Sequence, residues 1–251
     1  MNSIVQAAHL IINSKRTFAF TGAGISVESG IPTFRGEDGI WNHFDPKILD
    51  LQYYLNHPNK AWPHIKNLFY KEPNSFLPNT AHHILANWEE RAILEGIITQ
   101  NIDYLHQAAG SIIVHEFHGT TNSFICTSCN TIYNRSEIII NKYPPICLNK
   151  ACSSLLKPNF TFFGEGIPQH AFIKSQESTL DTDVYLVIGT SGEVSPANQI
   201  PIMAKQNGAT IIEINTKASL YTSEITDLFI QGSSTKIIKL IDDKIKSFLT
   251  K

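Results

Sequence analysis

The sequence predicts an α/β fold in which a doubly wound parallel sheet carries a smaller inserted domain. Short, continuous apolar runs alternate with helical stretches, a glycine-containing turn follows the first run, and two segments interrupt the alternation. Runs rich in Ile, Val and Phe, without polar residues at every second position, are typical of parallel strands that helices cover on both faces. Regular alternation of such strands with helices favours a doubly wound sheet.

The elements of this sheet can be assigned in chain order. Ile4, Ala8, Ile11 and Ile12 recur at helical spacing, which predicts an amphipathic first helix. The expected strands are Thr17–Phe20, Gly96–Thr99, Val184–Gly189, Thr210–Asn215 and a final strand at Lys236–Ile241. A further extended run covers Ile112–Phe117.

Two segments break the alternation and indicate an insertion. Gly36 to Asn79 is rich in aromatic residues and histidine, and Thr120 to Pro158 contains every cysteine. We therefore expect a main domain formed by residues 1–35, 80–119 and 158–251, and a small domain formed by 36–79 and 120–157. A length of 251 residues suits one large domain with a modest insertion.

Composition excludes several classes of protein. Hydrophobic residues make up 42% of the chain, which excludes a disordered protein. Lys and Arg number 20 against 22 Asp and Glu, with no basic stripe, so no nucleic-acid partner is expected. No apolar stretch is long enough to span a membrane, and Lys15 and Arg16 follow the first apolar segment instead of preceding it as in a secretory signal. A cytoplasmic location is expected; the oligomeric state is left open, with a monomer as the simplest case.

The four cysteines predict a metal site. Cys126 and Cys129 form a C-x2-C pair, and after 17 residues Cys147 and Cys152 form a C-x4-C pair. This spacing is close to that of zinc ribbons, in which two pairs of thiolates hold one tetrahedral Zn²⁺. Two disulfides are the alternative, which a reducing cytosol disfavours. Four protein ligands leave no open position, so we expect a structural zinc ion.

The turn after the first strand indicates a nucleotide. Thr17–Phe20 continues into Thr21-Gly22-Ala23-Gly24-Ile25-Ser26, and a helix is expected to follow. Glycines allow close backbone approach to a pyrophosphate, and a helix start offers free N–H groups. The third glycine of the usual dinucleotide fingerprint is replaced by Val27, so this turn alone is a weak signal.

Longer motifs make the signal specific. The run from Gly22 to Gly36, Thr99-Gln-Asn-Ile-Asp103 and His118-Gly119 resemble the sirtuin family of NAD-dependent protein deacylases, nearest to its bacterial and archaeal deacetylases. Pro158-Asn159, Phe163-Gly164-Glu165, Gly189-Thr190-Ser191 with Val194 and Pro196, and Ile214-Asn215 continue the resemblance in family order. It covers residues 15–240 and implies an NAD domain with a small domain made of a helical insertion and a zinc ribbon.

The resemblance implies a role for each motif residue. Gly22, Ala23, Gly24 and Arg35 would bind the pyrophosphate, and Phe34 would cover the ribose. Gln100 and Asn101 would bind ribose hydroxyls, Ile102 would also belong to the cofactor site, and Asp103 would accept from the nicotinamide carboxamide. The residues expected at the adenosine half are Gly189, Thr190, Ser191 and Asn215.

The catalytic residues implied by the resemblance are His118 and Asn101. An imidazole titrates near neutral pH, which suits a general base. His118 would take a proton from a ribose hydroxyl after the acyl oxygen has displaced nicotinamide, and the products would be free lysine and O-acyl-ADP-ribose. NAD would therefore be consumed as a cosubstrate.

An acylated protein or peptide is the partner that the resemblance implies. Phe163, Gly164 and Glu165 would border it, within an edge from Phe162 to Gly166 that adds the peptide as a strand. The chain departs from the common family pattern at Lys157, where Arg is frequent, at Phe160-Thr161 and at Gly192. Ile65 and Leu68 stand about where succinyl-selective members carry Tyr and Arg, so a neutral acyl group such as acetyl is expected.

Other readings of the same residues stay open. Asp103 could simply cap a following helix, and Thr190-Ser191 could cap theirs. The same fold could also act as a mono-ADP-ribosyltransferase or an NAD hydrolase. A non-catalytic NAD-binding regulator is a third possibility, which His118 and Asn101 disfavour because a binding module needs no base at the ribose.

Overall fold

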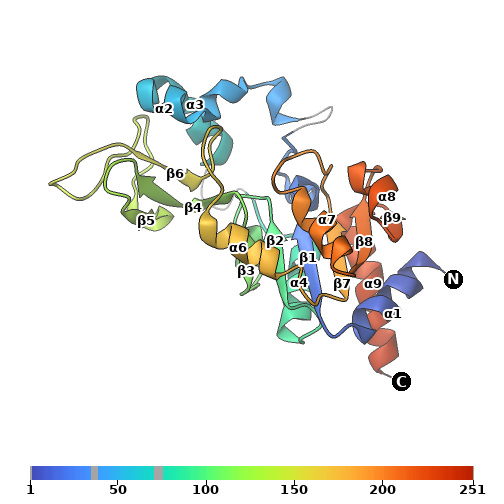
Figure 1. The fold of residues 1–251 in the computed structure, drawn as a ribbon. Helices are drawn as coiled ribbons and strands as arrows, with labels where there is room; N and C mark the ends of the chain where they lie inside the picture. The colour runs from blue at the N-terminus through green and yellow to red at the C-terminus, as the bar shows by residue number, and fades with distance from the viewer. Residues whose placement is uncertain (1, 35–38, 71–75, 251) are drawn as a thin grey trace.

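The computed structural model describes residues 2–34, 39–70 and 76–250. Its main sheet has six parallel strands in the order β3-β2-β1-β7-β8-β9 (Figure 1). These are β1 (Thr17–Thr21), β2 (Gly96–Thr99), β3 (Val114–Glu116), β7 (Val184–Ile188), β8 (Thr210–Asn215) and β9 (Leu228–Gln231). Counted along the chain, this is the strand order of a doubly wound dinucleotide-binding domain. The predicted fold class is confirmed.

Helices cover both faces of the main sheet. One face carries α1 (Ser3–Asn13), α4 (Thr80–Glu90) and α9 (Ser234–Leu249), and the other carries α6 (Gln169–Glu177), α7 (Gln199–Gln206) and α8 (Leu220–Glu224). Neighbouring strand residues point to opposite faces. Ala19 and Leu186 therefore pack in the first core, and Phe20 and Val187 in the second. Burial on both faces explains why the strand sequences are apolar throughout.

The prediction of a final strand at Lys236–Ile241 is wrong, because this segment lies inside α9. Its isoleucines fall at helical spacing, and Ile237, Ile241 and Ile245 are buried against the sheet. A short apolar run cannot be assigned to strand or helix from periodicity alone. The last strand is instead the four-residue edge strand β9, and the first helix is confirmed as α1.

A second, three-stranded antiparallel sheet packs against the helical insertion, and it includes Gly119 and residues 158–160, which the sequence analysis assigned to the main domain. Its order is β5 (Ile132–Asn134), β4 (Gly119–Cys126) and β6 (Leu156–Phe160). Above it in Figure 1 lie α2 (Leu51–Asn56) and α3 (Pro58–Phe69). Trp62 of α3 packs against Phe124 of β4, with 6.2 Å between ring centroids. The insertion and the cysteine-containing segment thus share one hydrophobic core.

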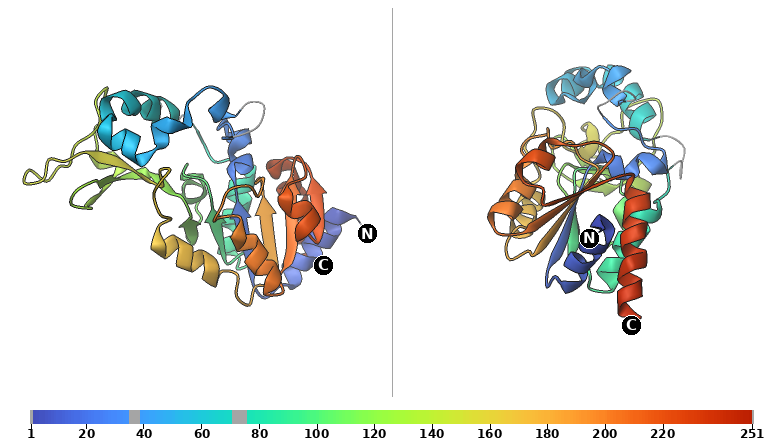
Figure 2. Two further views of the ribbon diagram at one scale, coloured as in Figure 1. Left: turned by 45° about the horizontal axis from the view of Figure 1, so that its top comes forward. Right: turned by 90° about the vertical axis from the view of Figure 1, so that its right-hand side faces the viewer.

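The short elements connect these layers. They are the 3₁₀ helices η1 (Ala23–Ser29), η2 (Ile40–Asn42), η3 (Pro46–Leu49) and η4 (Arg135–Glu137), and the one-turn helix α5 (Leu105–Ala108). Both ends of the chain lie on the side of the main sheet away from α2 and α3, with α1 packed against α9 (Figure 2). Within the described residues, no helix has the length and apolar character needed to cross a membrane.

Candidate active site

A cleft of about 880 Å³ lies where the carboxyl ends of the parallel strands meet the segment after β6 and residues of the helical insertion. This is the edge at which open parallel sheets bind ligands. Its lining includes most of the residues predicted from the motifs: Gly22, Ala23, Gly24, Phe34, Gln100, Asn101, Ile102, His118, Phe163, Gly164, Glu165, Gly189, Thr190, Ser191 and Asn215. Arg35 lies outside the described residues.

Two glycine loops cross at the floor of this cleft. The Gly22 and Gly24 amides donate to the carbonyls of Ile188 and Gly189, at 2.9 Å each. A Cβ on Gly24 would lie 2.7 Å from the Gly189 Cα, and Gly189 has a φ of +63°. The glycines are therefore required by the contact between two loops of the protein, besides any approach of a pyrophosphate. The helix expected after them is the 3₁₀ helix η1.

Asn101 is buried and held by three hydrogen bonds. Its Nδ2 donates to the Gly22 carbonyl and to Ser26 Oγ, at 3.2 Å each. Its backbone N–H donates to Thr99 Oγ1 at 3.0 Å, and the Thr21 hydroxyl donates to the same oxygen at 2.9 Å. Because both kinds of nitrogen are engaged, Oδ1 is the side-chain atom that Asn101 can offer to a ligand.

Two buried histidines, His106 and His82, lie next to the Thr21–Thr99 hydrogen bond that supports Asn101. His106 Nε2 lies 2.9 Å from Thr21 Oγ1 and must donate to it, since the Thr21 proton goes to Thr99. The ring of His82 lies 4.8 Å from that of His106. Burial lowers the pKa of His82 to about 4 and that of His106 well below its usual value. Both rings are therefore neutral at neutral pH and serve as fixed supports for the site.

Asp103 lies beside the cleft instead of in its lining. Its Oδ2 accepts from Ser26 Oγ at 2.7 Å, and its Oδ1 accepts from the Leu105 N–H at 3.0 Å, at the start of α5. Burial raises the pKa of this carboxyl group. Asp103 therefore bonds the first N–H of α5 without being its N-cap residue, which is Tyr104, and contact with a carboxamide stays a prediction.

His118 follows β3 and faces the cleft. Its Nδ1 lies 2.9 Å from the Gln100 carbonyl oxygen. A carbonyl can only accept, so Nδ1 carries the proton and Nε2 keeps its lone pair. Burial lowers the pKa of the imidazole, and the bond to Gln100 opposes this only in part. The ring is thus an unprotonated base held in one tautomer.

Gly119, the next residue, fixes the position of His118. Gly119 has a φ of +75°, and a Cβ there would lie 2.3 Å from the Asn159 carbonyl oxygen. The Thr161 N–H donates to the His118 carbonyl at 2.8 Å. The junction between β3 and β4 is therefore pressed against the end of β6, which brings the predicted base next to the predicted peptide edge.

The predicted peptide edge is an irregular segment after β6. The Phe163 N–H donates to the Leu49 carbonyl at 2.8 Å, and its own carbonyl accepts from the Leu51 N–H at 3.1 Å. The backbone of Phe163 is therefore already paired with the helical insertion. Gly164 has open space around it, since a Cβ there would meet no atom within 4 Å.

At the opposite end of the cleft, side-chain amides join the ends of β2, β7 and β8. Gln100 Nε2 donates to Thr190 Oγ1, and Asn215 Nδ2 donates to the Thr190 carbonyl, at 2.9 Å each. The Ser191 hydroxyl donates to the Glu193 carboxylate at 3.3 Å. These bonds fix the strand ends at which the adenosine half of NAD was predicted.

The cleft also contains residues to which the sequence analysis gave no role. They include Val27, Glu28, Thr33, Trp41, Leu49, Ile167, Glu193, Ser195, Thr216, Lys217, Ala218, Gly232, Ser233 and Ser234. Recognition of β9 as a strand would have pointed to Gly232–Ser234, because these residues follow its carboxyl end. No motif pointed to Trp41, whose ring lies 5.6 Å from that of Phe34 and 6.1 Å from that of Phe163.

The four cysteines form one cluster at the end of the small sheet. Their Sγ atoms lie within 4.8 Å of one another, with 3.6 Å from Cys126 to Cys152 and 3.7 Å from Cys129 to Cys147. Ligands 2.3 Å from a tetrahedral zinc ion would be about 3.8 Å apart. All four cysteines are free, and Tyr133 Oη lies 3.2 Å from Cys147 Sγ as a partner outside the ligand set. The donor set and its spacing fit a structural zinc ion.

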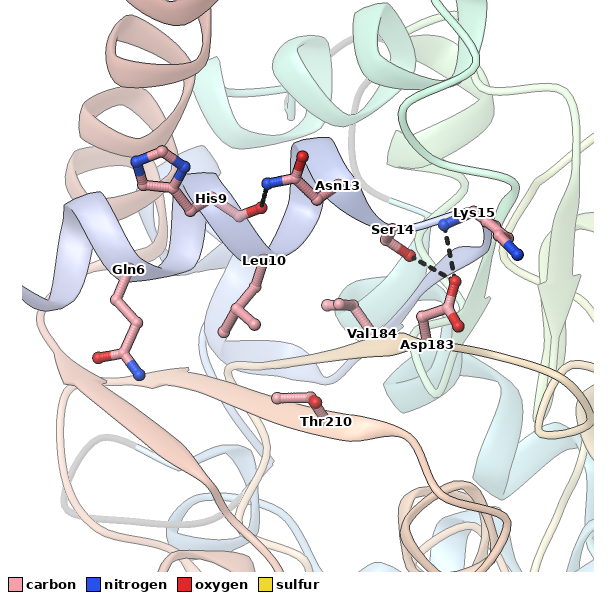
Figure 3. Close-up of a pocket in the computed structure, with 9 residues that line it drawn as sticks. All are labelled: Gln6, His9, Leu10, Asn13, Ser14, Lys15, Asp183, Val184 and Thr210. Carbon is pink, nitrogen blue, oxygen red and sulfur yellow. Dashed lines mark hydrogen bonds between the residues drawn. The ribbon is translucent and has the colours of Figure 1, made fainter.

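A second cavity, of about 460 Å³, lies between α1 and the amino ends of β7 and β8 (Figure 3). Asp183 occupies one side and accepts from the Lys15 N–H at 2.7 Å and from the Ser14 hydroxyl at 3.4 Å. This is the edge of the sheet opposite the glycine loops, and the carboxylate is already bonded to the chain. The larger cleft is therefore the candidate active site.

Comparison with known proteins agrees with this assignment. The profile of the Sir2 family matches residues 22–196. The chain is 37% identical over 247 residues to NAD-dependent protein deacylase 2 of Pyrobaculum aerophilum, with 96% of each chain covered. It is 38% identical over 256 residues to NAD-dependent protein deacylase of Pyrococcus abyssi, covering 98% of this chain and 99% of the relative.

Solved structures give the same result. A structure of a Sir2 homologue–NAD complex superposes with a TM-score of 0.87 at 37% identity, covering 96% of this chain and 94% of the other. A Sir2–p53 peptide–NAD⁺ structure superposes with a TM-score of 0.85 at 30% identity, covering 95% and 97%. With the fold, the cleft and the cysteine cluster in agreement, the chain belongs to the Sir2 family.

Proposed function

We propose that this protein is an NAD-dependent protein-lysine deacylase that yields nicotinamide, O-acyl-ADP-ribose and free lysine. The observation that carries the proposal is His118, whose imidazole has an unprotonated Nε2 and faces the cleft between the glycine loops and the segment after β6. A module that only binds NAD needs no base at this place. The named deacylase and deacetylase relatives support the same activity.

The residues of the cleft fit NAD. Bound NAD supplies an ADP-ribosyl group whose bond to nicotinamide is broken in the reaction. The crossing glycine loops would receive the pyrophosphate, and Asn101 Oδ1 would accept from a ribose hydroxyl. Ser191 and Asn215, at the ends of β7 and β8, would hold the adenosine half. Complexes of Sir2 homologues with NAD and ADP-ribose support NAD as the ligand.

His118 would act as the general base. Its Nδ1–H bond to the Gln100 carbonyl aims Nε2 at the cleft, where it would take a proton from a ribose hydroxyl. Phe34 and Trp41 lie in ring contact at the side of the same cleft. Their apolar faces would exclude water from the reacting carbon, which favours transfer to the acyl group over hydrolysis of NAD.

The acylated peptide would bind at the segment after β6. Because Phe163 is already paired with Leu49 and Leu51, we propose that the peptide backbone adds at Gly164 to Gly166. The zinc site would be structural and would hold the carboxyl end of β4 against the start of β6, and the peptide segment follows the other end of β6. The division into an NAD domain and a small domain remains our proposal for how the chain is organised.

Product analysis tests the proposed function. Incubation with NAD and an acetyl-lysine peptide should give nicotinamide, O-acetyl-ADP-ribose and deacetylated peptide, each measured by mass spectrometry. A peptide that gains ADP-ribose would support the transferase alternative, and free ADP-ribose with an unchanged peptide would support an NAD hydrolase.

The cleft also predicts which acyl group is removed. Ile65 is fully buried in the small-domain core, and neither it nor Leu68 lines the cleft. Apolar side chains near the peptide segment come instead from Trp41, Leu49 and Phe162. Among the described lining residues the only Lys or Arg is Lys217, which follows β8 at the adenosine end.

Acetyl-lysine should therefore be preferred to succinyl-lysine. Among the described lining residues no Lys or Arg lies near the peptide segment to pair a succinyl carboxylate. An unpaired buried group costs about 1–3 kcal/mol or more, which is roughly tenfold or more in kcat/KM. Matched kinetics on one peptide sequence measure this. Butyryl-lysine, a neutral chain of similar length, is the control: it should be turned over, and equal rates for succinyl and butyryl would contradict the prediction.

A further inference from the structure

Lys157 in β6 is a buried lysine with a complete set of partners. It is 6% exposed. Its Nζ donates to the carbonyls of Pro158 and Phe160 at 2.9 Å each, and lies 3.0 Å from Glu165 Oε2. An ammonium group has three N–H donors, and all three are used here. Lysine is almost never fully buried unless it is paired, so these three partners are what allows Lys157 to be buried here.

Glu165, the carboxylate partner of Lys157, is itself bonded to the backbone of Phe162. Its Oε2 also accepts from the Phe162 N–H at 2.7 Å, and its own N–H donates to the Phe162 carbonyl at 3.0 Å. The Lys157 Nζ also lies 4.7 Å from the centroid of the Phe162 ring. Oε2 of Glu165 is therefore bonded within the protein, although the sequence analysis placed this residue in contact with the substrate.

The segment held in this way is the one that borders the cleft. Its inner side is fixed by Lys157, and its outer side is fixed by the pairing of Phe163 with Leu49 and Leu51. Between these two attachments the backbone turns at Gly164, where φ is +89°. The Thr161 N–H bonds the His118 carbonyl, so the same segment also sets the distance between the base and the peptide edge.

We propose that Lys157 and Glu165 are positioning residues that hold residues 161–166 in the conformation that receives the acylated peptide. This inference rests on the proposed deacylase function. In this role the pair acts through the backbone of the segment, although Glu165 itself also lines the cleft. The inference predicts that replacing either residue weakens peptide binding. NAD binding should be unaffected, because the pair does not contact the glycine loops or the strand ends.

The decisive variant is the double replacement K157M/E165Q. Either single replacement leaves one buried charge without its partner and is expected to lower the melting temperature. The double variant removes both charges with side chains of similar size, so it tests the positioning role without an unpaired charge. We expect its KM for an acetyl-lysine peptide to rise about 10- to 100-fold, the order expected when a binding segment is misplaced by about 1 Å.

Other measurements separate positioning from general damage. The dissociation constant for NAD, measured by calorimetry, should stay within about twofold, and kcat at saturating peptide should fall much less than kcat/KM. The Phe162 amide should lose protection from hydrogen exchange. K157R should keep the peptide KM near that of the parent, because a guanidinium can bond both the carboxylate and the carbonyls. K205M, which removes a lysine paired with Asp227 away from the cleft, is the matched control.

The outcomes distinguish this inference from the proposed function. A parent protein that neither binds nor deacylates the peptide would refute the proposed function and the inference with it. A parent that is active, with a double variant that has the same peptide KM, would overturn the inference alone. If the double variant does not fold, E165D is the alternative test, because it shortens the side chain by one methylene group and keeps the negative charge. A several-fold rise in peptide KM is expected for it, and an unchanged KM would refute the positioning role.

Discussion

Replacement of His118 by alanine is expected to lower the rate of deacylation by about 10²–10⁴, the usual contribution of a general base. The imidazole Nε2 is the unprotonated atom directed into the cleft, and no methyl group can replace it. The affinity for NAD should change only a few-fold, because the glycine loops and strand ends are unaffected. Steady-state kinetics with acetyl-lysine peptide and calorimetry with NAD measure the two effects.

His115→Ala is the matched control for this variant. His115 lies on β3, three residues before His118, and does not line the cleft. Its replacement should leave the rate within about twofold. If the His118→Ala protein kept a rate within a few-fold of the parent, a base at this position would be excluded.

The pH dependence of the parent should report the same group. Burial lowers the pKa of His118 from its usual 6.5, and the base acts in its neutral form. Activity should therefore be constant at neutral pH and fall only as the pH drops below 6.5. A midpoint of the acidic limb in kcat/KM above 7 would contradict the assignment.

Loss of a cysteine ligand is expected to unfold the zinc ribbon. Freshly purified protein should contain one zinc ion per chain, and Cys126→Ser should abolish its binding. Metal binding and folding are coupled in sites of this kind. A variant that cannot bind zinc therefore loses the stabilisation that the metal gives to the folded ribbon. Metal analysis and hydrogen exchange of residues 120–157 measure the two effects.

The consequence should extend to the cleft. Cys126 ends β4, and β6 carries Lys157 and leads into the peptide segment, so unfolding of the ribbon should also abolish deacylation. Ser128→Ala, which changes a side chain between two ligands, is the control and should retain the metal. Zinc-free parent protein, or a Cys126→Ser protein with full protection of the ribbon, would refute the assignment.

The sequence predicted the sheet well where burial on both faces leaves a continuous apolar run, as in β7 and β8. It failed at the carboxyl end, where Lys236–Ile241 within α9 is a longer segment, with four apolar residues against three in the short edge strand β9. That single error also hid Gly232–Ser234 from the list of cleft residues, because the strand that ends before them was not recognised.

Within the site, the sequence identified residue types better than their partners. Glycine motifs and cysteine spacing are properties of the chain, and both predict geometry directly. The partners of the Asp103 and Glu165 carboxylates come next to them only in the folded protein. Spacing could not distinguish a carboxylate that meets a ligand from one that is bonded to Ser26 or Lys157.

The strand order has a consequence for synthesis on the ribosome. β1 pairs with β7, more than 160 residues further along the chain. At about 5–20 residues per second, one edge of β1 waits roughly ten to thirty seconds for its neighbour. The helical insertion and the ribbon are complete before β7 is made, so the nascent chain can bind zinc first. The unpaired edge of β1 is then the part of the emerging protein most exposed to aggregation, and the part a chaperone would have to protect.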